Sequence, residues 1–337
     1  MSHDFTHDDR IATIAACTTL GRSSDRASEN GSLTPTEWNK LAQWLHDHDS
    51  QPADLLDRIA IKKTISDGTL DSRLLAKIET LPERASITAL EIERFEHRGI
   101  WALARFEDEY PKRWRQCLKA QSPPVIFGAG PAQLINERAI AIVGSREIGP
   151  ELMDTADLLG RSVAKSGFVM VSGGARGSDR MGMTGAIDYG GNVAGIVSGA
   201  LDRLSRSSDT SSWIAEGSLC LVSHVQPNVG FSVGNAMARN KLIHGLADAT
   251  LVISTSSGSG GTWAGSVENL KKGWSPLLVW SGPGAPEANA ALIKEGGFAF
   301  EHIPTDEHEF EALISSATEH AAGQQAARAQ PAQQALL

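Results

Sequence analysis

Glycine and arginine stand together in two short stretches of this sequence, and each stretch directly follows an apolar run. Residues 142–146 read IVGSR, and residues 172–179 read SGGARGSD. Glycine allows the backbone to approach a ligand closely, and a guanidinium binds phosphate through two parallel hydrogen bonds. The pairing therefore predicts an anion site that takes a phosphate backbone. Its candidate residues are Gly144, Ser145, Arg146, Ser172, Gly173, Gly174 and Arg176.

Two more stretches add residues of the same kind. Residues 254–263, STSSGSGGTW, form another glycine-rich turn after an apolar run, and residues 231–248 read FSVGNAMARNKLIHGLAD. In the second stretch two cations flank an asparagine on a helix that an aromatic residue precedes. Such a group is either a stacking and phosphate platform for single-stranded nucleic acid or a solvated helix face. The candidates here are Phe231, Arg239, Asn240, Lys241, Gly260, Gly261 and Thr262.

The pattern from residue 136 onward supplies the elements that would position these turns. Apolar runs alternate there with helical segments: the runs are RAIAIVG, FVMVSGG, NVAGIVSG, SLCLVS, ATLVIST and PLLVW. Strands that alternate with helices predict βαβ units and a parallel sheet covered on both faces. We therefore expect an α/β fold with a Rossmann-like, doubly wound, mostly parallel sheet. Turns at the carboxyl ends of such strands meet at one edge, where ligands bind.

The chain divides into four expected segments. The first part reads as short helices, with a capping signal in LTPTEWNK, a flexible loop at 23–32 and Gly99 as a stop. Pro123 and Pro124 interrupt any helix further on. The Ala/Gln-rich end predicts a frayed helix or disorder. The segments are a helical N-terminal domain at 1–98, a lead-in segment at 99–135, the Rossmann-like domain at 136–305, and a C-terminal helix with a low-complexity tail at 306–337.

Composition restricts the class of protein. The 337 residues carry a formal net charge of -9, which argues against a surface coated in cations but is compatible with a local basic groove. No stretch approaches the ~20 apolar residues of a membrane span, and the N-terminus, MSHDFTHDDR, is polar and acidic. Three distant cysteines suit a reducing compartment. We therefore expect a cytoplasmic protein with no membrane partner.

Catalytic and metal-binding patterns are weak. The sequence has no P-loop and no G-x-S-x-G elbow, and His224 and His244 lack the spacing of metal ligands. Asp179 is expected to cap a helix. We therefore expect no catalytic residue, no cofactor and no metal, in a protein that is not an enzyme.

Four ordered motifs give the sequence a family resemblance. IVGSR, SGGARGSD, ALD at 200–202 and F-x-x-x-N-x-x-x-RNKLI-x-x-LAD resemble the DNA-processing protein A family (DprA, also called Smf). The resemblance implies a Rossmann-like domain that binds single-stranded DNA, often as a homodimer, and that loads the recombinase RecA in competent bacteria. It implies DNA contacts by Arg146, Arg239 and Lys241, in a pocket shaped by Arg176 and residues 172–174.

Departures from the family pattern indicate a divergent branch. Gly174 and Ser178 stand in the SG-x-ARG-x-D motif where a small apolar residue is usual, and no histidine follows Asp179 closely. The main hypothesis is a DprA-like single-stranded DNA-binding protein in DNA processing and recombination, with RecA as a further partner. A second hypothesis is an antitoxin or regulatory subunit of an anti-phage system with a toxin-like partner. A third is a nucleotide-binding or phosphoribohydrolase-like enzyme, because GGT at 260–262 is similar to a turn of the cytokinin-activating phosphoribohydrolases.

Overall fold

The structure is a computed structural model that describes residues 5–21, 31–66 and 70–334, without the side chains of 63–66 and 327–334. The loop expected at 23–32 lies almost entirely outside the described residues. The helices are α1 (His7–Cys17), α2 (Pro35–Asp47), α3 (Arg58–Ser66), α4 (Ser72–Ile78), α5 (Leu81–Glu96), α6 (Pro150–Lys165), α7 (Ser178–Asp188), α8 (Leu201–Leu204), α9 (Ser208–Ala215), α10 (Val233–Leu246), α11 (Gly260–Lys272), α12 (Glu287–Lys294) and α13 (Glu307–Gln334). Short helical turns are η2 (Pro52–Leu56), η3 (Trp114–Leu118), η4 (Lys119–Gln121) and η5 (Ala132–Asn136).

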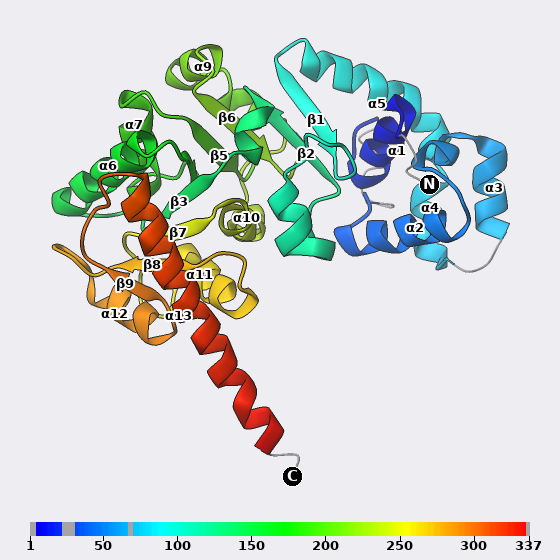
Figure 1. Ribbon diagram of the computed structural model, residues 1–337. Helices are drawn as coiled ribbons and strands as arrows, with labels where there is room; N and C mark the ends of the chain where they lie inside the picture. Colours follow the sequence, from blue (N-terminus) through cyan, green and yellow to red (C-terminus); the bar gives the residue numbers. More distant parts are fainter. Residues whose placement is uncertain (1–4, 22–30, 67–69, 335–337) are drawn as a thin grey trace.

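In the described part of the chain, nine strands form one sheet, in the order β1-β2-β6-β5-β4-β3-β7-β8-β9 (Figure 1). They are β1 (Ile100–Ala104), β2 (Val125–Ala129), β3 (Ala139–Val143), β4 (Val169–Ser172), β5 (Val193–Val197), β6 (Leu219–Ser223), β7 (Ala249–Val252), β8 (Leu277–Trp280) and β9 (Phe298–Phe300). From β3 onward neighbouring strands are parallel, whereas β1 and β2 are antiparallel at one edge. This arrangement confirms the expected Rossmann-like, doubly wound, mostly parallel sheet.

The order of the strands reverses between β3 and β7. The chain builds outward from β3 through β4 and β5 to β6, then returns so that β7 pairs with the other side of β3. A reversal of this kind opens a crevice at the carboxyl ends of the two strands, and ligands bind there in doubly wound folds. The fold therefore selects the turns after β3 and β7 as the place to look for a site.

Both faces of the sheet are covered, which explains the continuous apolar runs in the sequence. All five residues of β3 are buried. Its residues Ile140 and Ile142 pack into a core with α6 and α7, while Ala141 and Val143 pack into a second core with α10 and α12. Alternate residues of one strand thus serve two cores, as the period of two in a strand requires.

The N-terminal helices have a core of their own, which contains Trp38, Leu41 and Leu74. Thr34 and Glu37 form the capping box expected at the start of α2: the Glu37 N–H donates to Thr34 Oγ1 (3.3 Å), and the Thr34 N–H donates to Glu37 Oε2 (2.8 Å). The lead-in segment does more than connect the two parts. It supplies the antiparallel strands β1 and β2, so the helical region is attached directly to one edge of the sheet (Figure 1).

Residues 307–334 form the long helix α13, which is one of the two alternatives expected for this part of the chain. Its side chain Phe310 is fully buried and lies 5.7 Å from the Phe168 ring, centroid to centroid. The far end of α13 extends away from the body of the molecule (Figure 1). None of the described helices has the length and apolar character needed to cross a membrane.

Candidate functional site

Three glycine-containing turns meet at the crevice between β3 and β7. The Gly144 N–H donates to Asp179 Oδ1 (3.3 Å), which belongs to the segment after β4. The Ser145 N–H donates to Ser254 Oγ (3.0 Å), and Thr262 Oγ1 donates to the Gly144 carbonyl oxygen (3.0 Å); both partners follow β7. The convergence expected from the strand ends is therefore present, with the Gly144 turn at its centre.

Close packing explains why glycine stands in this turn. A side-chain carbon at Gly144 would overlap Ser178 at the start of α7. Gly177 has a φ of +80°, which favours glycine, and a side-chain carbon there would overlap the carbonyl oxygens of Ser145 and Arg146. These turns are thus fixed against one another by backbone contact.

A cleft of about 590 Å³ opens at this point. Nine of the fourteen predicted site residues line it, namely Gly144, Ser145, Arg146, Phe231, Arg239, Asn240, Gly260, Gly261 and Thr262. Helices α7 and α11 begin beside it, and the first N–H groups of a helix attract anions. Asn240 Nδ2 donates to the Gly261 carbonyl oxygen (3.0 Å) and so ties α10 to the turn before α11.

Arg239 lies deep in this cleft, and only 7 % of it is exposed. Its Nη1 donates to the Ile196 carbonyl oxygen, while its buried Nε has no hydrogen-bond partner among the described residues. Burial lowers the pKa of Arg239, and the charge of Asp179 opposes that change. A buried guanidinium with an unused N–H is costly unless an acceptor arrives. The arrangement therefore favours an anionic ligand.

Asp179 does not cap its helix as expected. Gly177 occupies the capping position of α7, and the Asp179 carboxylate instead accepts from the Gly144 N–H. Burial raises the pKa of this carboxyl, and the Arg239 charge lowers it. Asp179 thus positions the turn that contains Gly144. Hydrophobic periodicity and helix propensity did not reveal this role. The one feature of the sequence that pointed to it was the place of Asp179 in the first turn of a helix, directly after a glycine-rich loop.

Arg146 is the exposed cation of the cleft. Its guanidinium lies over the Phe231 ring, 5.8 Å from the centroid, and Phe231 is 58 % exposed. In the described parts of the chain no carboxylate lies within 4 Å of the Arg146 guanidinium nitrogens. Glu147, the neighbouring residue, is exposed and also lines the cleft. One uncompensated cation and one open aromatic face are thus available to a ligand.

The remaining predicted residues stand apart from the cleft lining. Ser172 is buried, and its hydroxyl donates to the Ile142 carbonyl oxygen (2.9 Å), which is a structural role. Gly173 lies beneath the Arg239 guanidinium, so that any side chain there would overlap it. Gly174 and Arg176 are exposed. Lys241 lines a different pocket on the other side of α10, beside His224.

His244, a residue outside our candidate set, lines the floor of the cleft. Its Nδ1 lies 3.1 Å from Thr250 Oγ1, and the side chain is buried. Burial, together with the nearby Arg239 charge, lowers the pKa of His244 to about 3. His244 is therefore neutral at pH 7 and adds no charge to the cleft. Among the described residues, no group of three or more His, Cys, Asp and Glu side chains could hold a metal ion.

The fold and the cleft define a doubly wound α/β protein with a crevice, lined by Arg146 and Arg239, at the reversal of its strand order. The family model for the DNA recombination-mediator protein A matches residues 101–272, about half of the chain, and the chain belongs to this family. A curated relative is DNA processing protein DprA of Bacillus subtilis, which is 25% identical over 169 residues that make up 49% of this chain and 56% of that protein. The match thus spans about half the length of the curated relative.

Solved structures extend the similarity of fold. DNA processing protein A of Streptococcus pneumoniae superposes with a TM-score of 0.68 at 17% identity, and the match covers 93% of this chain and 99% of that one. DNA processing protein A of Helicobacter pylori, described for its single-stranded DNA binding mode, gives a TM-score of 0.51 at 22% identity, over 65% of this chain and 96% of that one. The first match includes the helical region, so both parts of the architecture occur together in a relative.

Proposed function

We propose that this protein binds single-stranded DNA, without catalysis, in the cleft between β3 and β7. One observation carries the proposal: the exposed Arg146, stacked on the open Phe231 ring, stands at the mouth of a cleft that holds the buried, incompletely paired Arg239. Phosphate would be captured by the cations and by the helix N-termini. A base would stack on the exposed aromatic ring. The family and the Helicobacter pylori relative support this choice of ligand.

The enzymatic alternative receives no support from the described carboxylates. A phosphoribohydrolase-like site would need a carboxylate close to the turn at 260–262. Glu268 is exposed and does not line the cleft, and Asp179 is engaged with the Gly144 N–H. Glu147 lines the cleft as an exposed residue next to Arg146 and, within the described structure, has no hydrogen bond to the turn at 260–262. Binding without chemistry therefore fits these residues better. RecA, a toxin-like protein and a second copy of the chain stay predictions for further partners, as does a cytoplasmic location.

Arg146 and Glu147 are adjacent and carry opposite charges, so they permit a matched test of DNA binding in the cleft. We would measure the binding of fluorescein-labelled oligo-dT by anisotropy across a salt series, for the wild type, Arg146→Gln and Glu147→Gln. Each phosphate contact adds about 0.7 to the slope of log affinity against log salt. Arg146→Gln should weaken binding and reduce the slope by about 0.7, whereas Glu147→Gln should strengthen binding.

Arg138→Gln is a suitable control, because Arg138 pairs with Glu307 and Glu311 (both 3.0 Å) and does not line the cleft. Its affinity should equal that of the wild type. If oligo-dT does not bind, or if Arg146→Gln and Arg138→Gln behave alike, the cleft is not the DNA site.

A further inference from the structure

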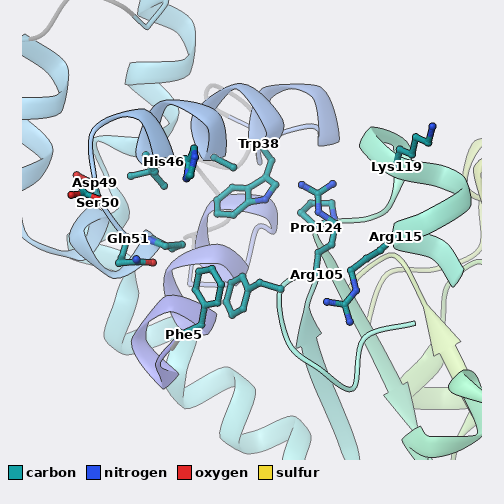
Figure 2. A pocket seen from close by; sticks show the side chains of 14 residues that line it. Phe5, Trp38, His46, Asp49, Ser50, Gln51, Arg105, Arg115, Lys119 and Pro124 are labelled. Carbon is teal, nitrogen blue, oxygen red and sulfur yellow. The ribbon is translucent and has the colours of Figure 1, made fainter. Parts of the chain in front are cut away.

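A second pocket lies between the helical N-terminal region and the segment that follows β1 (Figure 2). Its volume is about 650 Å³, within the range of roughly 300–1,000 Å³ that small-molecule sites occupy. No described residue lines both this pocket and the cleft between β3 and β7. We call it the interdomain pocket, and nothing in the proposed DNA-binding mechanism uses it.

Aromatic rings form one wall of the interdomain pocket. Phe5 and Phe106 stack with their centroids 4.1 Å apart and their planes inclined by 19°, although they are far apart in sequence. Phe5 is still 47 % exposed. Trp38 of α2 lies beneath this wall, at the edge of the N-terminal core, and only 4 % of it is exposed (Figure 2). A wall of this kind suits a flat ring, because aromatic pairs stack or meet edge to face.

Cations form the opposite wall. Arg105, Arg115 and Lys119 line the pocket, and within the described ranges no carboxylate lies within 4 Å of their side-chain nitrogens. Figure 2 shows Arg105 and Arg115 close to Pro124, with Lys119 at the outer edge. The lining of the pocket thus carries three cations and one carboxylate, Asp49, in a chain with a net charge of -9.

Neutral oxygens hold the two arginines in place without cancelling their charge. Arg105 Nη2 donates to Asn39 Oδ1 (2.6 Å), and its Nη1 donates to the Ser122 carbonyl oxygen (3.3 Å). Arg115 Nη2 donates to the carbonyl oxygens of Glu107 (3.3 Å) and Tyr110 (3.2 Å). The arginines are thus positioned in advance for an anion, which reduces the entropic cost of binding one.

We infer that the interdomain pocket binds a nucleotide, with its base against Phe5 and its phosphate at Arg105, Arg115 and Lys119. Asp49, Ser50 and Gln51 lie across the pocket from the cations and offer hydrogen bonds to the sugar or the base (Figure 2). A mostly apolar lining with a few convergent polar groups is typical of such sites. The nucleotide is either free or one unit of a bound strand, because the same chemistry recognises both.

Calorimetry with AMP, adenosine and inorganic phosphate tests the inference. AMP should bind the full-length protein more tightly than adenosine or inorganic phosphate does, because only AMP contacts both the aromatic wall and the cationic wall. Phe5→Ala should weaken AMP binding about tenfold, which is the effect of one base–aromatic stack. Lys119→Gln should weaken it about threefold, as the loss of an exposed ionic contact does.

Control variants outside the interdomain pocket test whether AMP binds in this pocket. Phe231→Ala removes another exposed aromatic ring, and Lys112→Gln another exposed lysine, neither of which lines the interdomain pocket. AMP affinity should be unchanged in both, and in Arg146→Gln. The inference is overturned if AMP does not bind the wild type, or if Arg146→Gln abolishes AMP binding while Phe5→Ala does not.

Oligo-dT distinguishes the two sources of the nucleotide. If Phe5→Ala weakens AMP binding and leaves oligo-dT binding intact, the pocket takes a free nucleotide. If Phe5→Ala weakens both, the pocket holds one unit of a strand. Because Arg146→Gln affects only the cleft, a failure of the DNA-binding proposal would not change the AMP result.

Discussion

Gly173 and Arg239 share one space at the site, and neither can be understood without the other. The Arg239 guanidinium occupies the volume that a side chain at Gly173 would need. The glycine therefore serves the buried cation rather than touching a ligand. Family resemblance and turn chemistry both selected Gly173, but only the packing shows why it must lack a side chain.

Gly173→Ala should displace Arg239 and damage the cleft. The added carbon would destabilise the protein by about 1–3 kcal/mol, as overpacking does, and weaken oligo-dT binding. Urea unfolding and anisotropy would measure the two effects. Gly230→Ala is the control, because a side-chain carbon at Gly230 meets nothing within 4 Å. Equal behaviour of the two variants would contradict the shared-space model.

Burial of His244 should make stability depend on pH. Burial lowers its pKa to about 3 in the folded protein, whereas an unfolded chain titrates near 6.5. The unfolded state therefore binds more protons at this residue below about pH 6.5, and the His244 contribution to the free energy of unfolding falls by up to about 1.4 kcal/mol per pH unit toward about pH 3. His224, whose pKa burial lowers to about 4, adds a slope of the same sign. Urea unfolding between pH 7.5 and about pH 5 would show the slope.

The variants His244→Gln and His302→Gln test whether His244 causes this pH dependence of stability. His244→Gln should make the pH dependence shallower over the same interval. His302 has a side chain that is 91% exposed, so His302→Gln should keep the wild-type slope. A wild-type slope in His244→Gln would assign the effect to other groups.

Helices α6 and α7 make backbone contact on one face of the sheet. Gly160 of α6 faces the Gly182 carbonyl group of α7, and Gly185 of α7 faces the backbone of Asp157 in α6. A side-chain carbon at Gly160 or at Gly185 would overlap these atoms. The two helices therefore need glycine for their separation, although glycine is a poor helix former.

Gly185→Ala should destabilise the protein despite the better helix propensity of alanine. We expect a loss of about 1–3 kcal/mol from overpacking, measured by urea unfolding. Gly234→Ala in α10 is the matched control, because a side-chain carbon there meets only Ser232 Oγ at 4.0 Å. It should gain up to about 1 kcal/mol from propensity. A gain at Gly185 would show that the helices can separate freely.

The helices and strands were largely predictable from the sequence. Which side of each helix or strand faces the site was not. Continuous apolar runs predicted β3 to β8, because strands buried on both faces need them. The sequence placed Arg239 and Lys241 together, and the structure separates them into two pockets for a geometric reason. Two residues apart on α10 are about 200° apart around a helix, so Arg239 enters the cleft and Lys241 the opposite pocket.

At the scale of the molecule, the C-terminal helix is part of the folded core. Phe310 is fully buried and contributes to the same core as Ile140 and Leu159. Phe310→Ala should therefore cost about 3–5 kcal/mol of unfolding free energy, measured by urea denaturation. The neighbouring His308 is exposed, and His308→Ala should leave stability unchanged. Similar small effects in both variants would show that α13 is only loosely attached.

The hydrogen bond between Thr262 and Gly144 joins residues that are 118 positions apart in a chain of 337. A ribosome makes β3, β4, β5 and β6 well before it reaches that threonine. The half of the sheet from β3 to β6 can therefore pack against its helices during translation, while the second wall of the crevice has not yet been synthesised. The cleft is a late product of chain synthesis, and a nascent chain that stalls before α11 presents an unfinished one.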